Sequence, residues 1–169
     1  CGGFLYFHTN AGGAEDFRIV RAPLDDPSPA AWTDVVPHRP GTLILGMRLF
    51  RGHLVWLHRS DGLPRIEVRR LEDGEEHTIA FEEEVYDLSM VPGFEFDTTT
   101  LRFVYSSPTT PLEIYDYNLD DRTRVLRKRQ EVPSGHYPDH YQTRRLMATA
   151  PDGDQVPVSV VYRIDTPLD

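Results

Sequence analysis

Three residues near the middle of the sequence have the side chains of a serine-hydrolase triad. They are His58, Ser60 and Asp61. They are neighbours along the chain, whereas a triad is assembled from distant segments, and Asp61-Gly62 is typical of a hairpin turn. None of the serines lies in a G-x-S-x-G sequence, so the chain has no nucleophile elbow. We expect no catalytic residue here.

Two clusters have the residue types of metal ligands. His136 and His140 flank Asp139, but Pro138 interrupts a segment too short for a stable helix, so the two histidines are not expected to share a face. Glu82-Glu83-Glu84 is an acidic run, and adjacent residues on an extended chain point apart. We interpret the run as a solvated loop, and we expect neither a metal site nor a cofactor.

A glycine-rich segment and a lone cysteine complete the candidates. Residues 10–16 lack the spacing and the lysine of a P-loop, and no helix is expected to follow them, so they are interpreted as a flexible hairpin loop. Cys1 stands at the very start of the sequence and is not a credible nucleophile. A single cysteine rules out an internal disulfide framework and suits a reducing compartment, so we expect a cytoplasmic protein.

The charge balance argues against two classes of partner. With 18 Lys and Arg against 27 Asp and Glu, the formal net charge is −9. Nucleic acid and an anionic membrane surface would both repel such a chain. No apolar run approaches the roughly 18 residues that a membrane-spanning helix needs.

Short strands separated by turns dominate the sequence. Residues 42–81 are predicted to form four strands in a row, with breaks at Arg51-Gly52, Asp61-Gly62 and Asp73-Gly74. Within residues 64–70, apolar and charged side chains alternate strictly, as they do in a strand with one buried face. This pattern predicts an antiparallel meander.

The pattern recurs along the chain. Residues 54–71 match residues 101–119 at an offset of 47–48, and Leu24 precedes Leu71 by 47 residues. A period in the forties is typical of propeller blades of four strands each. The sequence therefore predicts an all-β fold, a partial β-propeller of about two and a half four-stranded antiparallel blades. Its complete blades are expected at about 43–81 and 85–132, after a block with strands at 4–9, 17–22 and 32–36.

The last predicted strand of the third block, residues 123–130, carries a run of cations. They are Arg124, Arg127, Lys128 and Arg129. Charge on an outermost strand discourages pairing with another chain, and we favour this explanation over a basic docking patch.

The repeat ends after Val132. Residues 133–141 are rich in turn formers and are interpreted as a linker. Strands are then expected at 143–150 and 155–163, joined by a turn at Pro151-Asp152-Gly153-Asp154. We therefore expect residues 1–132 to be propeller blades and residues 142–169 to be the first, truncated hairpin of another domain.

Several segments together resemble a known family. They are HTN, FRIVRAPL, VPHRPG and HLVWLHRSDGLPRIEV in the first half, and VPSGHYPDHYQTRRLMATAPDGDQVPVSVVYR at residues 132–163. Essentially the whole chain resembles the late propeller blades and the start of the peptidase domain in the oligopeptidase B branch of the prolyl oligopeptidase family. The most specific part lies at residues 141–163. The linker run HYPDHY departs from the family, which has a more acidic His-Asp-Pro run there.

The resemblance implies a role that the residues alone do not show. Members of the family have a propeller that caps an α/β-hydrolase domain with a Ser, Asp, His triad, and the oligopeptidase B branch cleaves short peptides after Arg or Lys. No position of this chain matches the triad, so the parent protein is expected to be a serine peptidase while this chain alone is inactive. The propeller would admit oligopeptides and exclude folded proteins.

Two classes of function remain open. The chain is either the non-catalytic part of such a peptidase, with oligopeptides and the peptidase domain as partners, or a stand-alone propeller module that binds proteins. The final hairpin favours the first, because a stand-alone propeller has no need of it. Uncovered sheet faces and edges also predict that the isolated chain self-associates.

Overall fold

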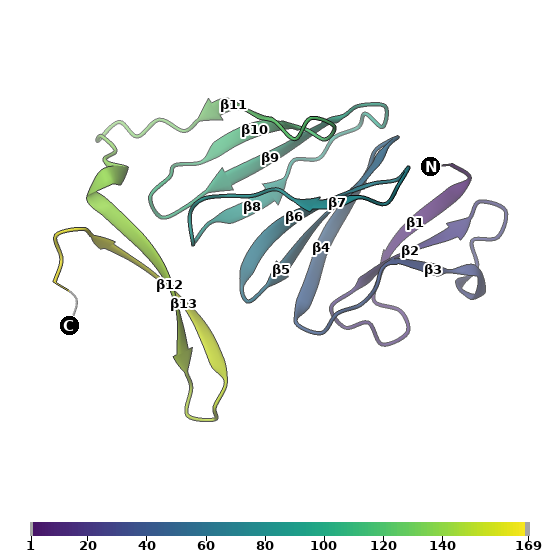
Figure 1. Cartoon of the computed structure of the whole chain (residues 1–169), viewed down its shortest axis with the longest axis horizontal. Coiled ribbons are helices and arrows are strands. Elements are labelled where there is room, and N and C mark those ends of the chain that lie inside the picture. Colours follow the sequence, from purple (N-terminus) through teal and green to yellow (C-terminus); the bar gives the residue numbers. More distant parts are fainter. Residues whose placement is uncertain (1, 168–169) are drawn as a thin grey trace. The chain divides into compact units, whose positions relative to one another are not determined.

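The computed structural model describes residues 2–167, and the regular secondary structure in this range consists of β-strands and two short 3-10 turns (Figure 1). Its strands form four antiparallel sheets, ordered β1-β2-β3, β4-β5-β6-β7, β11-β10-β9-β8 and β12-β13. The two four-stranded sheets are meanders in which consecutive strands pair, as in propeller blades. The expected all-β fold with a partial propeller and a following hairpin is confirmed. Cys1 lies outside the described residues.

The chain divides into two compact units. One comprises the chain up to Ile79 together with Phe94–Thr99, and the other comprises Ala80–Gly93 together with the chain from Thr100 onward. The first unit contains the first two sheets, and the second contains the third sheet and the hairpin.

The first sheet has three strands, β1 (Phe4–Thr9), β2 (Arg18–Pro23) and β3 (Thr33–Val36). The third strand begins one residue later than expected. Trp32 instead closes a short 3-10 turn, η1 (Pro29–Ala31), by donating its backbone N–H to the Pro29 carbonyl. The indole of Trp32 stacks on Phe7 of β1 at 5.3 Å between ring centroids, so the turn is fastened to its own sheet.

The second sheet contains β4 (Thr42–Leu49), β5 (His53–Ser60), β6 (Leu63–Arg70) and β7 (Glu76–Thr78). Asp61 and Gly62 connect β5 to β6 with φ values of 51° and 71°, the left-handed backbone of the two-residue turn that matches strand twist. The last strand is shorter than expected, with three residues in place of about seven.

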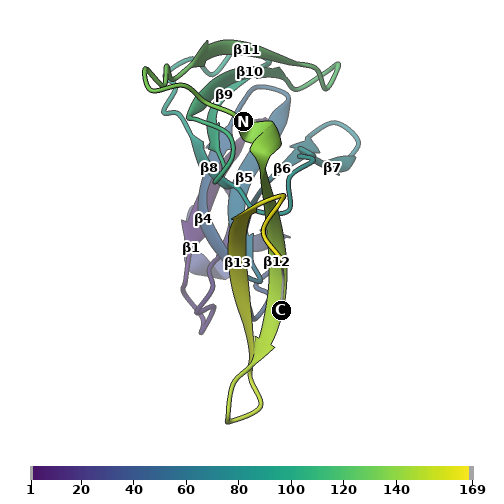
Figure 2. The same ribbon diagram turned by 90° about the vertical axis from the view of Figure 1, so that its left-hand side faces the viewer.

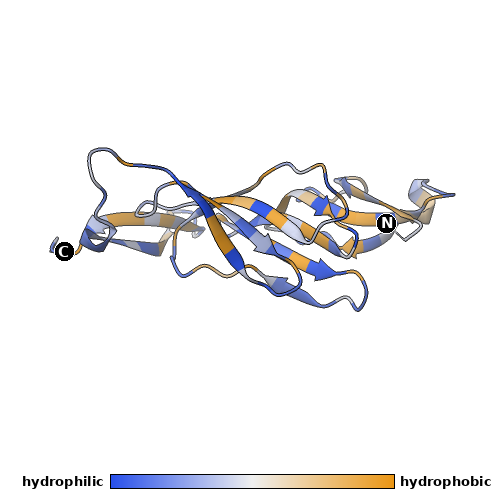
Figure 3. Cartoon of the chain, turned by 90° about the horizontal axis from the view of Figure 1, so that it is seen from above, coloured by the Kyte–Doolittle hydropathy of each residue, from blue (hydrophilic) through white to orange (hydrophobic). Residues whose placement is uncertain are grey.

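The core of the first unit lies between its two sheets. Ile19 of β2 packs with Ile44, Leu54 and Trp56 of the second sheet, all of them buried. The guanidinium of Arg69 reaches across to the Val35 carbonyl at 2.6 Å. In Figure 3, hydrophobic and hydrophilic segments alternate along several strands, and successive residues of a strand point to opposite faces of its sheet.

The third sheet contains β8 (Asp87–Met90), β9 (Thr100–Ser106), β10 (Glu113–Asn118) and β11 (Arg124–Arg129). Its apolar face carries Leu101, Phe103 and Tyr105, all buried, as the alternation predicts. The pairing of β10 with β11 shifts register between Ile114 and Tyr115, so Arg127 is an extra residue on the outer strand. Such a bulge re-aims a side chain.

A loop connects β8 to β9, and its central residues, Phe94–Thr99, belong to the first unit. They are held there by Arg51, whose backbone N–H donates to the Phe96 carbonyl at 3.0 Å and whose guanidinium pairs with Asp97 at 2.7 Å. The Phe94 side chain is fully exposed.

The chain ends in a hairpin of β12 (Tyr141–Thr149) and β13 (Gln155–Arg163), preceded by the 3-10 turn η2 (Pro138–His140). Figure 2 shows it as a long twisted ribbon. The two strands pair along their whole length, and the turn between them is where the sequence predicts it. Neither strand contains a buried residue, although both carry apolar side chains.

Candidate functional site

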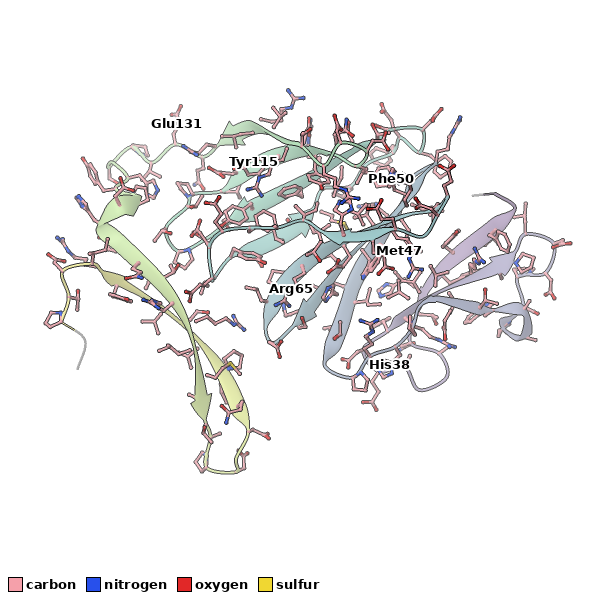
Figure 4. The ribbon with its side chains drawn as sticks, viewed as in Figure 1. His38, Met47, Phe50, Arg65, Tyr115 and Glu131 are labelled. Carbon is pink, nitrogen blue, oxygen red and sulfur yellow. The ribbon has the colours of Figure 1, made fainter. Side chains whose placement is uncertain are left out.

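The residues with the composition of a triad are not assembled as one. His58 lies on β5 with its Nε2 3.3 Å from a carboxylate oxygen of Glu67 on β6. The Ser60 hydroxyl accepts a hydrogen bond from the guanidinium of Arg65, labelled in Figure 4. Asp61 occupies the turn between the two strands. His58 and Ser60 thus have separate partners, and the three side chains do not line up for proton transfer.

Of the two histidines before the hairpin, His140 lies in the 3-10 turn η2 and His136 in the irregular segment that precedes it. His140 ends η2, and its ring stacks on Tyr137 at 5.3 Å between centroids. Within residues 2–167, no group of three or more His, Cys, Asp or Glu side chains is arranged to hold a metal ion.

The acidic run differs from its expectation. The prediction of a solvated loop fits Glu82, which is exposed. It is wrong for Glu83, which is half-buried and accepts hydrogen bonds from three hydroxyl groups of the same unit. Glu84 accepts the backbone N–H of Arg145 at 2.9 Å and so connects the run to the hairpin. The run lies in a bend rather than on extended backbone, and two of its three residues have specific partners.

Glu83 faces a cavity of about 240 Å³ in the second unit. Three aromatic rings, two arginines and three carboxylates line it, together with one threonine: Phe81, Tyr105, Tyr115, Arg124, Arg129, Glu82, Glu83, Glu113 and Thr110. The strands β9, β10 and β11, the loop between β9 and β10, and the segment before β8 supply these residues. We define these nine residues as the blade cavity.

Tyrosine hydroxyls bind both inner carboxylates of the blade cavity. Tyr105 donates to Glu83 at 2.8 Å, and Tyr115 donates to Glu113 at 2.5 Å. Register explains the arrangement, because Glu113 lies opposite Tyr105, and Tyr115 is the next residue of β10 on the same face. Tyr115 is labelled on this sheet in Figure 4.

Burial and hydrogen bonding set the charge of these groups. Burial and then the bonded carboxylate raise the pKa of Tyr105 and the pKa of Tyr115, so both phenols keep their protons at neutral pH. Burial alone would raise the pKa of Glu83, but hydrogen bonds from neighbouring hydroxyls outweigh it and leave that pKa below its usual value. Glu83 is therefore an ionised carboxylate.

Two arginines of the outer strand, β11, make contacts within the second unit. Arg129 donates through Nε to Glu113 at 2.6 Å, and Arg124 donates to the Ala80 carbonyl at 2.9 Å while lying over the rings of Phe81 and Tyr115. The expected protection of the sheet edge stays a prediction, and the structure adds that each of these two arginines also contacts an acceptor or a ring within its own unit.

The opposite face of the third sheet carries a second ion-pair cluster. Asp116 accepts two hydrogen bonds from Arg102, at 2.7 and 2.9 Å, and one from Arg127 at 2.8 Å. Hydrogen bonding to Arg102 is the largest of the effects that hold the pKa of Asp116 below its usual value. Val125 lies opposite Asp116 in the register of the two strands, and Arg127, two residues further along β11, reaches Asp116 from the same face.

The chemistry of the blade cavity suits binding. Tyr105 and Tyr115 keep their protons, and Glu83 and Glu113 accept hydrogen bonds, so none of these four side chains is activated as a nucleophile. Sequence reasoning missed the cavity. The signal available in the sequence was a glutamate and a tyrosine, Glu113 and Tyr115, two residues apart and so on one face of a strand.

Comparison with known proteins places the chain in a family. The sequence model described as "Prolyl oligopeptidase, N-terminal beta-propeller domain" matches residues 1–130. The chain is 37% identical over 162 residues to a dipeptidyl aminopeptidase BI of Pseudoxanthomonas mexicana. The aligned region covers 95% of this chain and 22% of that protein. It is 28% identical over 150 residues to protease 2 of Moraxella lacunata, covering 89% of this chain and 21% of that protein.

Solved structures of oligopeptidase B are also similar to this chain. Oligopeptidase B from Leishmania major superposes with a TM-score of 0.84 at 29% identity, over 96% of this chain and 24% of that one. Oligopeptidase B from Trypanosoma brucei gives a TM-score of 0.83 at 30% identity, over 98% and 26%. The chain thus spans about a fifth of the length of the curated relatives it matches. It belongs to the prolyl oligopeptidase family, and its residues 1–130 are β-propeller of the family's N-terminal domain.

Proposed function

We propose that this chain is the non-catalytic propeller part of an oligopeptidase B-like serine peptidase. The observation that carries the proposal is the match of residues 1–130 to the family's propeller domain, together with TM-scores above 0.8 against oligopeptidase B. The propeller limits access to a triad on a hydrolase domain, so that short peptides enter and folded proteins do not. The peptidase cleaves after Arg or Lys, acts in the cytoplasm and needs no cofactor.

The terminal hairpin supports the link to a hydrolase domain. Residues 142–169 are proposed as the first hairpin of that domain, after a linker at 133–141. Its strands expose apolar side chains that a sheet of the partner domain would cover: Leu146, Met147, Val156, Val158 and Val161. In the isolated chain the same surfaces promote self-association. Light scattering over a concentration series, compared with a chain ending at Val132, measures this.

The experiment for the main proposal uses the full-length protein that contains this chain and the 169-residue chain by itself. The full-length protein should hydrolyse Arg and Lys amide substrates, and an active-site serine reagent should stop it. The chain by itself should give only background hydrolysis. Turnover by the isolated chain, blocked by the same reagent in a preparation free of other proteases, would contradict the assignment.

Size selection is tested with one cleavage sequence in different settings. The same Arg-containing segment is presented as a short peptide, as an unstructured longer peptide and as an exposed loop of a folded protein. We expect cleavage to fall with size and to vanish for the folded protein. Equal cleavage of all three would remove the gating role. A full-length protein without hydrolase activity would favour the alternative, a propeller module that binds proteins.

A further inference from the structure

Three turns of this chain contain the sequence Asp-Gly, which has a chemistry of its own. They are Asp61-Gly62, Asp73-Gly74 and Asp152-Gly153. In such a pair the backbone nitrogen of the glycine is tethered close to the side-chain carboxyl carbon of the aspartate, and glycine has no Cβ to obstruct their approach. All three pairs are exposed to solvent, so exposure does not distinguish them. Their hydrogen bonds do.

The turn between β6 and β7 holds both groups of its pair. The carboxylate of Asp73 accepts one hydrogen bond from the backbone N–H of Glu75 and one from the guanidinium of Arg70, each at 3.0 Å. The backbone N–H of Gly74 donates to the Arg70 carbonyl at 3.0 Å. The hydrogen bond from Glu75 is the largest of the effects that lower the pKa of Asp73, so this carboxylate stays ionised and resists attack by a nucleophile.

The turn between β12 and β13 also holds both groups. The carboxylate of Asp152 accepts the backbone N–H of Asp154 at 3.2 Å. The backbone N–H of Gly153 donates to the Ala150 carbonyl at 2.9 Å. In this turn, as in the previous one, these hydrogen bonds must break before the glycine nitrogen can reach the carboxyl carbon.

The turn between β5 and β6 differs from both. Within residues 2–167, the structure gives the Asp61 carboxylate no hydrogen bond or ion pair and the Gly62 backbone N–H no acceptor. The cause is the turn itself. Ser60 pairs with Leu63 to close a two-residue hairpin, so the amide between the two middle residues lies outside the hydrogen-bond ladder.

We propose that Asp61 is a site of spontaneous modification, in which it converts to isoaspartate through a cyclic imide. The Gly62 nitrogen attacks Cγ of the protonated Asp61 carboxyl group and forms a new N–C bond, while the amide proton and the carboxyl hydroxyl leave as water. A water molecule then adds to one of the two ring carbonyls. Breaking the bond from nitrogen to the main-chain carbonyl leaves Asp61 joined to Gly62 through its side chain, and breaking the new bond restores aspartate. The atomic composition of the chain is unchanged.

Isoaspartate would alter the connection between two central strands. The backbone gains one methylene between β5 and β6, where a two-residue turn matches the twist of the strands. The pairing of Ser60 with Leu63 and the hydrogen bonds from Arg65 to Ser60 lie next to the change. The new carboxylate also has the chemistry that an isoaspartyl-specific O-methyltransferase recognises. The proposal does not depend on the peptidase assignment, because it concerns this turn alone.

The test incubates the 169-residue chain at physiological temperature in water enriched in a heavy isotope of oxygen. Each opening of the ring places one labelled oxygen atom in the residue, whichever carbonyl the water attacks. Trypsin in ordinary water then separates the three turns, because they fall in peptides 60–65, 71–102 and 146–163. Mass spectrometry measures the label, and an isoaspartyl-specific methyltransferase detects the isoaspartate.

In the folded chain we expect peptide 60–65 to gain label and isoaspartate at least about tenfold faster than either of the other peptides. Tenfold corresponds to about 1.4 kcal/mol, roughly the net free energy of one or two of the hydrogen bonds that the other turns must break. In urea these bonds are absent, and the three rates should agree to within about threefold.

A variant checks that the label enters at Asp61. Asp61→Glu, whose longer side chain does not close the five-membered ring, should remove the signal from peptide 60–65 and leave the other two peptides unchanged. The comparison of folded and unfolded wild-type chain does not depend on how well this variant folds. Absence of label at Asp61 in the folded chain would overturn the proposal. So would a preference for Asp61 that is no greater in the folded chain than in urea, because the sequence alone would then explain it.

Discussion

Replacing Glu113 by glutamine should loosen the outer strand of the third sheet. Glu113 is 2% exposed, and its carboxylate accepts hydrogen bonds from the Tyr115 hydroxyl at 2.5 Å and from Arg129 at 2.6 Å. Glutamine keeps the shape and removes the charge. The Tyr115 hydroxyl can rotate to accept from the new amide, so both contacts persist, but neither is then made to an anion.

The size of the effect follows from these two contacts. A hydrogen bond to a charged group contributes about 1.5–3 kcal/mol and a neutral one about 1 kcal/mol, so the Tyr115 contact weakens by about 1 kcal/mol. The Arg129 side chain is 60% exposed, and an ion pair of that kind contributes only about 0.2–1 kcal/mol. The opening free energy of β10 and β11 should therefore fall by about 1.5 kcal/mol.

Native-state hydrogen exchange is the suitable assay, because the chain has two compact units and a single unfolding transition is not assured. Amides of β10 and β11 should lose protection, and amides of β5 and β6 should not change. The control is Glu131→Gln, which should alter exchange by less than about 0.5 kcal/mol. In a double-mutant cycle with Tyr115→Phe, the coupling should be about 1 kcal/mol. A coupling near zero would refute the view that the buried carboxylate and the phenol stabilise each other.

Three further predictions concern the same two units. The pKa of Glu83 is lower in the folded chain than its usual value of 4.5, so its ionisation stabilises the fold above that pH and the benefit is lost as the pH falls through the folded pKa. The urea midpoint should drop in acid below about pH 4.5, and Glu83→Gln should flatten that part of the profile. Phe103→Ala, at a fully buried ring, should cost about 3–5 kcal/mol in urea unfolding, whereas Val125→Ala on the exposed outer strand should cost less than about 0.5 kcal/mol. Gly62→Ala should lower the thermal midpoint by placing a Cβ at φ 71°, a strain of about 1–2 kcal/mol, while Asp61→Asn, which tolerates its φ of 51°, should be nearly neutral.

The sheets could be predicted from the sequence because their signals are local. Asp61-Gly62 fixes the turn between β5 and β6, and strict alternation along β6 fixes which residues face the core. Leu88 pairs with Tyr105, and Met90 with Phe103, as their shared periodicity implies. Each of these features is decided within a few residues of the chain.

The blade cavity could not be predicted because its contacts are not local. Glu83 reaches partners that lie 22, 26 and 27 residues further along the chain. Nothing in Glu82-Glu83-Glu84 distinguishes the middle residue, and only the pairing of β8 with β9 brings the segment before β8 close to Tyr105. The contacts of Arg124 and Arg129 could not be predicted for the same reason, since the sequence of a strand does not reveal which acceptors lie beside it.

The loop between β8 and β9, part of which belongs to the first unit, affects how the chain can fold during its synthesis. Because Phe94–Thr99 belongs to the first unit, the chain passes between the units after Ile79, after Gly93 and after Thr99. During synthesis the first unit therefore stays incomplete until the ribosome has released the residues up to Thr99, well after its last strand, β7, has emerged. A nascent chain stalled between these points would leave Arg51 without Asp97, its ion-pair partner at 2.7 Å. A single cut of the chain does not separate the two units, because each unit consists of two segments. To produce the second unit alone, Gly93 would have to be linked to Thr100 in place of Phe94–Thr99.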